Sequence, residues 1–153
     1  MKTIKDIMTP NCTWVSPETT IVDAAKKMRD QDIGFLAVGE NDRLIGTLTD
    51  RDVATRVVAA NKDAAELCVR DVMSKKLYYC FDDLDADAVA QNMAAMQVKR
   101  FPVVNRAKRL VGTVSFADLA TAASAQTFTN AQKQISARSS CGKTACGCAS
   151  NAA

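Results

Sequence analysis

The stretch LIGTLTDRD at residues 44–52 decides the fold, because it recurs as LVGTVSFAD at residues 110–118. Each copy begins with an apolar run typical of a β-strand and ends on a [Thr/Ser]-x-x-Asp string typical of a helix N-terminus. The sequence therefore predicts, twice, a strand that passes directly into a helix. The two helices are expected to begin at Asp50 and Phe116.

The repetition extends upstream of these two stretches. The triplet Asp-Ile-Met at 6–8 recurs as Asp-Val-Met at 71–73, an offset of 65 residues. Apolar residues spaced i, i+3, i+4, i+7 start at Ile21 and again at Ala86, which predicts one amphipathic helix in each half. Self-similarity of this kind indicates two structural units of one design.

Each half is therefore predicted to contain an extended segment, a helix, a hairpin of two strands and a final helix. A three-stranded sheet with two helices leaves an apolar face uncovered, and the other half is its natural cover. We expect a mixed α/β (α+β) fold in which two repeats, residues 1–64 and 65–123, pack with pseudo-two-fold symmetry. Residues 124–153 form a C-terminal region with a predicted helix near 127–138 and a Cys-rich end.

The composition excludes several kinds of chemistry. The chain of 153 residues has no histidine, which rules out Ser-His and Cys-His nucleophile pairs, and no other catalytic set is found. The net charge of +3 comes from Lys133, Arg138 and Lys143, so the body of the chain is neutral and offers no concentrated basic face for nucleic acid. No apolar run approaches the roughly 20 residues of a membrane span, and the first residues lack a secretory signal. We expect a cytoplasmic protein that is not an enzyme and binds neither nucleic acid nor membrane.

The doubled Gly-Thr-[Leu/Val]-[Thr/Ser]-x-x-Asp string is the strongest candidate for a ligand site. Its Thr or Ser, Thr49 or Ser115, caps a helix whose free N–H groups attract an anion such as phosphate. The carboxylate three residues on, Asp52 or Asp118, offers two acceptors that suit the neighbouring hydroxyls of a ribose. A simple capping box explains a single copy. Two copies, each with a glycine that capping does not require, favour a ligand site.

These features resemble a tandem pair of cystathionine-β-synthase (CBS) domains, often called a Bateman module, over about residues 4–123. The resemblance rests on the triplets at 6–8 and 71–73, on Phe-Pro-Val-Val at 101–104, and above all on the doubled string. The first half is also similar to small stand-alone bacterial CBS-pair proteins of the hypoxic-response type, in its strings Asp32-Ile33-Gly34 and Leu48-Thr49-Asp50-Arg51-Asp52.

The resemblance implies a regulatory module that binds AMP, ADP, ATP or S-adenosylmethionine in a cleft between the repeats, with no other cofactor. It implies ribose contacts from Asp52 and Asp118, and phosphate contacts near Thr49 and Ser115. The other ligand-binding residues that it implies are, around the base, Thr13, Val15, Ile33, Tyr79 and Val98, and, around the phosphates, Arg51, Lys99 and Arg100. Such modules are expected to pair as homodimers and to act on a separate effector protein.

Two other functions are compatible with the sequence. A CBS pair that binds no nucleotide would serve as a dimerisation or partner-docking unit. A thiol or metal sensor would use Cys141, Cys146 and Cys148, although a closed structural zinc site needs a fourth ligand.

Overall fold

The computed structural model describes residues 2–140, and the side chains of residues 2–137. The strands are β1 (Thr9–Pro10), β2 (Trp14–Val15), β3 (Phe35–Glu40), β4 (Arg43–Thr49), β5 (Cys80–Phe81), β6 (Arg100–Val104) and β7 (Leu110–Ser115). The helices are α1 (Ile4–Ile7), α2 (Ile21–Asp30), α3 (Asp50–Val53) with the π-helical turn η1 (Ala54–Val58), α4 (Val69–Val72), α5 (Ala86–Met96), α6 (Phe116–Leu119) and α7 (Ala125–Ser140).

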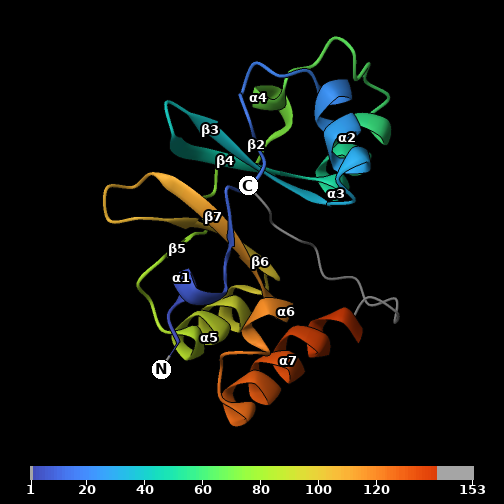
Figure 1. Ribbon diagram of the computed structural model, residues 1–153. Coiled ribbons are helices and arrows are strands. Elements are labelled where there is room, and N and C mark those ends of the chain that lie inside the picture. The colour runs from blue at the N-terminus through green and yellow to red at the C-terminus, as the bar shows by residue number, and fades with distance from the viewer. Residues whose placement is uncertain (1, 141–153) are drawn as a thin grey trace.

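The strands form two sheets that lie next to each other in the middle of the molecule. One sheet has the order β2-β3-β4 and the other the order β1-β7-β6-β5. Helices α2 and α3 lie on the outer side of the first sheet, and α5, α6 and α7 lie on the outer side of the second (Figure 1). The predicted mixed α/β fold is confirmed, and α3 and α6 begin at Asp50 and Phe116, as predicted.

The opening segment of each repeat packs against the other repeat. Ile4 of α1 is fully buried in the core around α5, and its N–H donates to the carbonyl of Leu84 at 2.9 Å. In the same way Val69 of α4 is buried in the core around α2, and its N–H donates to the carbonyl of Thr19 at 2.8 Å. Figure 1 shows α1 beside α5 and α4 beside the first sheet. The two repeats therefore exchange their opening segments.

Glycine is required where these exchanged segments cross the opposite sheet. A Cβ atom at Gly112 would lie 2.5 Å from the carbonyl oxygen of Thr9. A Cβ atom at Gly46 would lie 2.9 Å from the carbonyl oxygen of Ser74. Both distances are shorter than a carbon can tolerate, so only glycine permits the close approach. The repeated triplets and the repeated glycines are thus the two sides of one contact, made twice.

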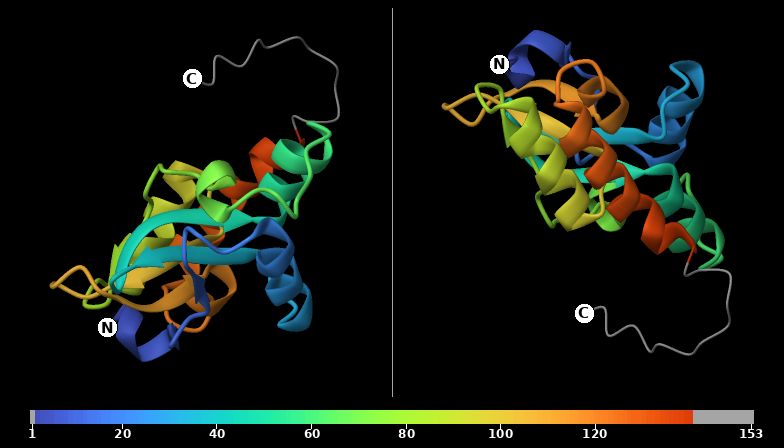
Figure 2. Two further views of the ribbon diagram at one scale, coloured as in Figure 1. Left: turned by 90° about the horizontal axis from the view of Figure 1, so that it is seen from above. Right: turned by 90° about the horizontal axis from the view of Figure 1, so that it is seen from below.

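Helix α7 packs along α5 and extends the core of the second repeat (Figure 2). Over residues 125–137 its buried side chains are Ala131 and Ile135, and Phe128 packs against the same cluster. The helix is two residues longer at each end than the predicted span 127–138. None of the helices among the described residues is long and apolar enough to cross a membrane.

Candidate functional site between the two repeats

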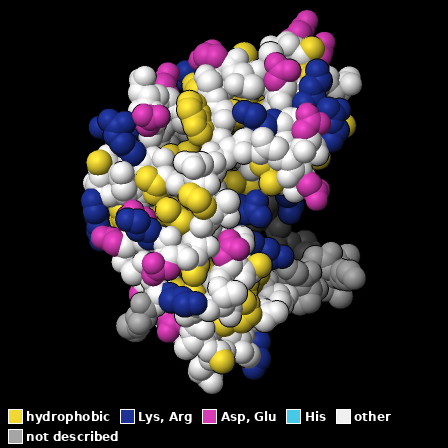
Figure 3. Space-filling view, viewed as in Figure 1, with side chains coloured by type: hydrophobic (Ala, Val, Ile, Leu, Met, Phe, Trp, Pro, Cys, Tyr) yellow, Lys and Arg dark blue, Asp and Glu magenta, His cyan; other side chains and the backbone are white. Residues whose placement is uncertain are grey.

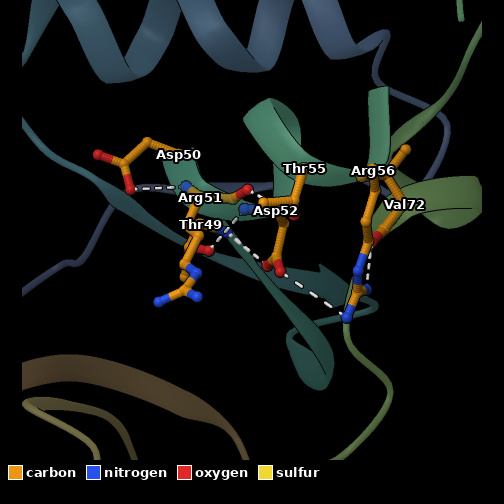
Figure 4. A network of polar contacts seen from close by, with 7 residues as sticks. All are labelled: Thr49, Asp50, Arg51, Asp52, Thr55, Arg56 and Val72. Carbon is orange, nitrogen blue, oxygen red and sulfur yellow. Dashed lines mark hydrogen bonds and ion pairs between the residues drawn. The ribbon is translucent and has the colours of Figure 1, made fainter. Parts of the chain in front are cut away.

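Both predicted helix starts are closed by capping boxes. The Thr49 hydroxyl accepts from the N–H of Asp52 at 3.1 Å, and Oδ2 of Asp52 accepts from the N–H of Thr49 at 3.0 Å. Ser115 and Asp118 make the same two hydrogen bonds at 3.3 and 2.8 Å. These bonds satisfy N–H groups that a helix start would otherwise leave without a partner. Figure 4 shows the arrangement at α3.

Capping uses one oxygen of each carboxylate. The second oxygen of Asp52, Oδ1, lies 3.8 Å from the guanidinium of Arg56, a distance that makes a loose ion pair. The second oxygen of Asp118 has no hydrogen-bond partner among residues 2–137. Both aspartates are part-buried. Capping and ligand binding are therefore compatible, and Asp118 keeps one acceptor fully available.

A cavity of about 590 Å³ lies where the two repeats meet; we call it the major cleft. Its volume lies within the roughly 300–1,000 Å³ typical of small-molecule sites. The first repeat lines it with Gly34, Phe35, Thr47, Thr49, Asp50 and Arg51, and the second repeat lines it with Tyr78, Gln97, Val98, Lys99, Arg100 and Pro102. The space-filling view shows Lys and Arg side chains beside a hollow between the two halves (Figure 3).

A second cavity of about 190 Å³, the minor cavity, is related to the first by the pseudo-two-fold symmetry. Its lining is Thr9, Asn11, Cys12, Thr13, Gln31, Ile33, Phe35, Arg100 and Thr113. Thr13 and Ile33 stand 65 residues before Tyr78 and Val98 of the major cleft. Phe35 and Arg100, which are themselves equivalent positions, line both cavities. The two cavities are thus equivalent sites of unequal size.

The cavities also differ in charge. Arg51, Lys99 and Arg100 bring three cations to the major cleft, and none of them takes part in an ion pair among the described residues. Arg51 and Asp52 leave the start of α3 in different directions, and the Arg51 guanidinium carries no contact within the network of Figure 4. In the minor cavity Arg100 is the one cation among the lining residues. An anionic ligand is therefore favoured in the major cleft.

Asp50 is the one acid among the described residues that line the major cleft. One of its oxygens accepts from the N–H of Arg51 at 2.8 Å. The other faces Gly34, where a Cβ atom would lie 2.7 Å from Oδ2. Glycine at this position therefore leaves room for the carboxylate.

The structure distributes the predicted ligand residues over several places. Five of them line the major cleft: Thr49, Arg51, Val98, Lys99 and Arg100. Two others, Thr13 and Ile33, line the minor cavity. Asp52, Ser115 and Asp118 line neither cavity and lie in the capping boxes at the helix starts beside them.

Two of the predicted base contacts lie elsewhere. Val15 is buried in the core of the first repeat. Tyr79 lines a third cavity of about 120 Å³, together with Leu44, Leu77, Val104 and Lys108. Its neighbour Tyr78 occupies the major cleft instead, because successive side chains of an extended segment point to opposite sides.

Several residues of the major cleft escape prediction from the sequence. Asp50 resembles an ordinary acid in the first turn of a helix, and Gln97 an ordinary polar residue after one. Pro102 lies in an apolar run and is buried, but it also lines the major cleft. Thr47 also lines the cleft and could have been predicted, because the alternation of side chains along β4 places it on the same side as Thr49.

The cysteines of the C-terminal region, Cys141, Cys146 and Cys148, lie outside the described residues. Among the described residues, burial raises the pKa of the Cys12 thiol to about 11. Burial, with a smaller contribution from the nearby Asp82 carboxylate, raises the pKa of the Cys80 thiol to about 12. Both side chains are therefore neutral thiols at physiological pH.

Comparison with known proteins places these observations in a family. The model of the CBS domain matches residues 4–59 and again residues 69–125. Hypoxic response protein 1 of Mycobacterium tuberculosis is 39% identical over 125 residues, which cover 78% of this chain and 84% of that protein. The CBS domain-containing protein YhcV of Bacillus subtilis is 38% identical over 120 residues, with the same coverage.

A solved structure shows the same architecture. The CBS domain pair of protein MJ0100, in complex with 5-methylthioadenosine and S-adenosyl-L-methionine, superposes with a TM-score of 0.70 at 25% identity. The match covers 79% of this chain and 94% of that one. With two matched copies, a doubled helix start and paired cavities between the repeats, this chain belongs to the CBS domain family as a tandem CBS pair.

Proposed function

We propose that this chain is a regulatory protein that binds an adenosine nucleotide, AMP, ADP or ATP, or S-adenosylmethionine, in the major cleft. The observation that carries the proposal is the set of three cations, Arg51, Lys99 and Arg100, that have no ion-pair partner among residues 2–137 and line a cavity of about 590 Å³. Cations without ion-pair partners favour an anionic ligand, and Arg in particular suits phosphate, so this observation favours the three nucleotides over S-adenosylmethionine, whose net charge is positive.

Residues in and beside the cleft could also contact the base and the ribose of a nucleotide. Tyr78, Val98 and Pro102 form an apolar wall on which a purine base would lie. The start of α6 is attached next to Val98, because the N–H of Phe116 donates to the carbonyl of the following residue, Lys99, at 2.8 Å. The free oxygen of Asp118, in the first turn of α6, would then accept from the ribose hydroxyls. The ligands of the MJ0100 CBS pair both carry an adenosyl group and no phosphate, which supports the base and ribose contacts of this proposal.

The regulatory role follows from the position of the cleft. Both repeats line it, so a bound nucleotide would favour one arrangement of the repeats, by no more than its difference in affinity for the two arrangements. The proposal includes a cytoplasmic homodimer that acts on a separate effector protein, and it assigns no catalytic step.

Calorimetric titration with AMP, ADP, ATP and S-adenosylmethionine tests the proposal. The matched variants are Asp118→Asn and Asp52→Asn, because the amide oxygen of Asn can still close the capping box. Asp118→Asn is expected to weaken binding about tenfold or more, whereas Asp52→Asn, whose second oxygen already lies 3.8 Å from the Arg56 guanidinium, is expected to change it less. A wild-type chain that binds none of the four ligands at millimolar concentration would instead be a dimerisation or docking unit.

A further inference from the structure

The wall of the major cleft is attached to the C-terminal helix. Residues 97–100, here called the cleft wall, join α5 to β6, and all four of them line the major cleft. Helix α7 packs along α5 and reaches the cleft wall where α5 ends (Figure 2). Two separate contacts make the connection.

The first contact runs through Gln97. Its backbone adopts the left-handed conformation, with φ 58°, and ends α5. Its side-chain amide donates to the carbonyl of Ala94 in α5 at 2.8 Å and to the carbonyl of Gln134 in α7 at 3.1 Å. One side chain of the cleft wall is therefore hydrogen-bonded to both helices.

The second contact runs through Phe116, the first residue of α6. Its ring stacks on the ring of Phe128 in α7, with centroids 4.7 Å apart and planes inclined by 15°. Its backbone N–H donates to the carbonyl of Lys99 in the cleft wall at 2.8 Å. The cleft wall is thus connected to α7 at two points, Gln134 and Phe128.

The first repeat shows that these contacts are particular to the second. The position equivalent to Phe116 is Asp50, whose carboxylate lies in the major cleft and faces Gly34. The position equivalent to Ala94, which is buried in the second repeat, is Arg29, an exposed residue paired with Asp30. Only the second repeat thus has the aromatic ring and the small buried side chain on which α7 packs.

We propose that α7 reports the occupancy of the major cleft: a nucleotide that holds the cleft wall in place stabilises the docking of α7, and undocking of α7 weakens nucleotide binding. This inference rests on the proposed function and adds the element that carries the signal. The coupling is reciprocal, because binding and docking are linked equilibria. Without α7, the ligand itself must order the cleft wall, and its affinity falls accordingly.

The test uses the full-length chain and two variants that alter α7 without touching the cleft. Phe128→Ala removes the stack on Phe116, and Gln134→Pro interrupts the helix at an exposed side chain. Thr129→Ala, an exposed position of the same helix, is the matched control. Circular dichroism and thermal melting establish that each variant keeps its folded repeats. Calorimetry with ATP, and with AMP in parallel, gives the dissociation constants, and hydrogen exchange of residues 125–137 is measured with and without nucleotide.

We expect both α7 variants to weaken binding about fivefold or more, within the usual range of coupling between sites. Thr129→Ala should leave it unchanged, and saturating nucleotide should slow hydrogen exchange in wild-type α7. Binding in the wild type with unchanged affinity in both variants and unchanged exchange would overturn the coupling alone. Absence of binding in the wild type would overturn the proposed function, and the coupling with it.

Discussion

Replacement of Arg51 by alanine gives the sharpest test of the charge arrangement in the major cleft. The guanidinium of Arg51 is exposed, lines the cleft and has no ion-pair partner among the described residues. The fold should therefore survive the substitution. Only the interaction with a phosphate is lost, and a hydrogen bond to a charged group contributes about 1.5–3 kcal/mol.

This loss corresponds to a roughly ten- to hundredfold rise in the dissociation constant for ATP, since about 1.4 kcal/mol is tenfold. Solvent screening places the expected value near the lower end, because the side chain is exposed. The ratio should shrink further as salt rises from about 0.15 M to 1 M, because the Debye length falls from about 8 to 3 Å.

Calorimetry at two salt concentrations measures the effect, and Arg43→Ala is the matched control. Arg43 is exposed, lines neither the major cleft nor the minor cavity, and carries the same charge. Adenosine, which lacks phosphate, should bind Arg51→Ala and wild type equally. Equal ATP affinity in the two arginine variants would refute the phosphate role, and a parallel loss of adenosine binding would show that Arg51→Ala acts on the shape of the cleft instead.

Two further predictions concern stability and thiol chemistry. Gly112→Ala should lower the free energy of unfolding by about 1–3 kcal/mol in urea titrations, because its Cβ would lie 2.5 Å from the Thr9 carbonyl oxygen. Gly39→Ala, with its nearest neighbour at 3.3 Å, should cost less, and an equal loss would contradict this account. Cys12 and Cys80 should resist alkylation at pH 8 until urea unfolds the chain, as peptide mapping would show. Because their folded pKa values of about 11 and 12 exceed the ordinary 9.0, the stability present below pH 9 should fall as pH rises from 9 towards 12. Rapid labelling of both thiols in the folded chain would be the contrary result.

Local patterns predicted the elements of the fold well. The offset of 65 residues, the helical spacing from Ile21 and Ala86 and the starts at Asp50 and Phe116 are all properties of short stretches. The exchange of α1 and α4 is not local, because it depends on contacts between residues that lie far apart in the chain. Its sequence signal, the glycines at 46 and 112, was present, but we interpreted it as a feature of the ligand site.

The sequence predicted where the candidate site lies better than it predicted which residues line it. The doubled string located the helix starts beside the two cavities. Tyr78 and Tyr79 differ by one position, and the direction of an extended side chain depends on register that the sequence does not contain. The unequal volumes of the cavities arise from side-chain packing across both repeats, which no single motif records.

The exchange of opening segments has a consequence for how such a protein can arise. A solitary first repeat would expose its own α1 to solvent and leave empty the site on which α4 packs, and the converse holds for the second repeat, so each unit is complete only beside a second copy. Duplication and fusion of the gene for a self-associating ancestor would therefore have preserved an existing dimer interface within one polypeptide. Severing the chain near residue 62 should likewise yield fragments that reassemble with each other more readily than either folds by itself.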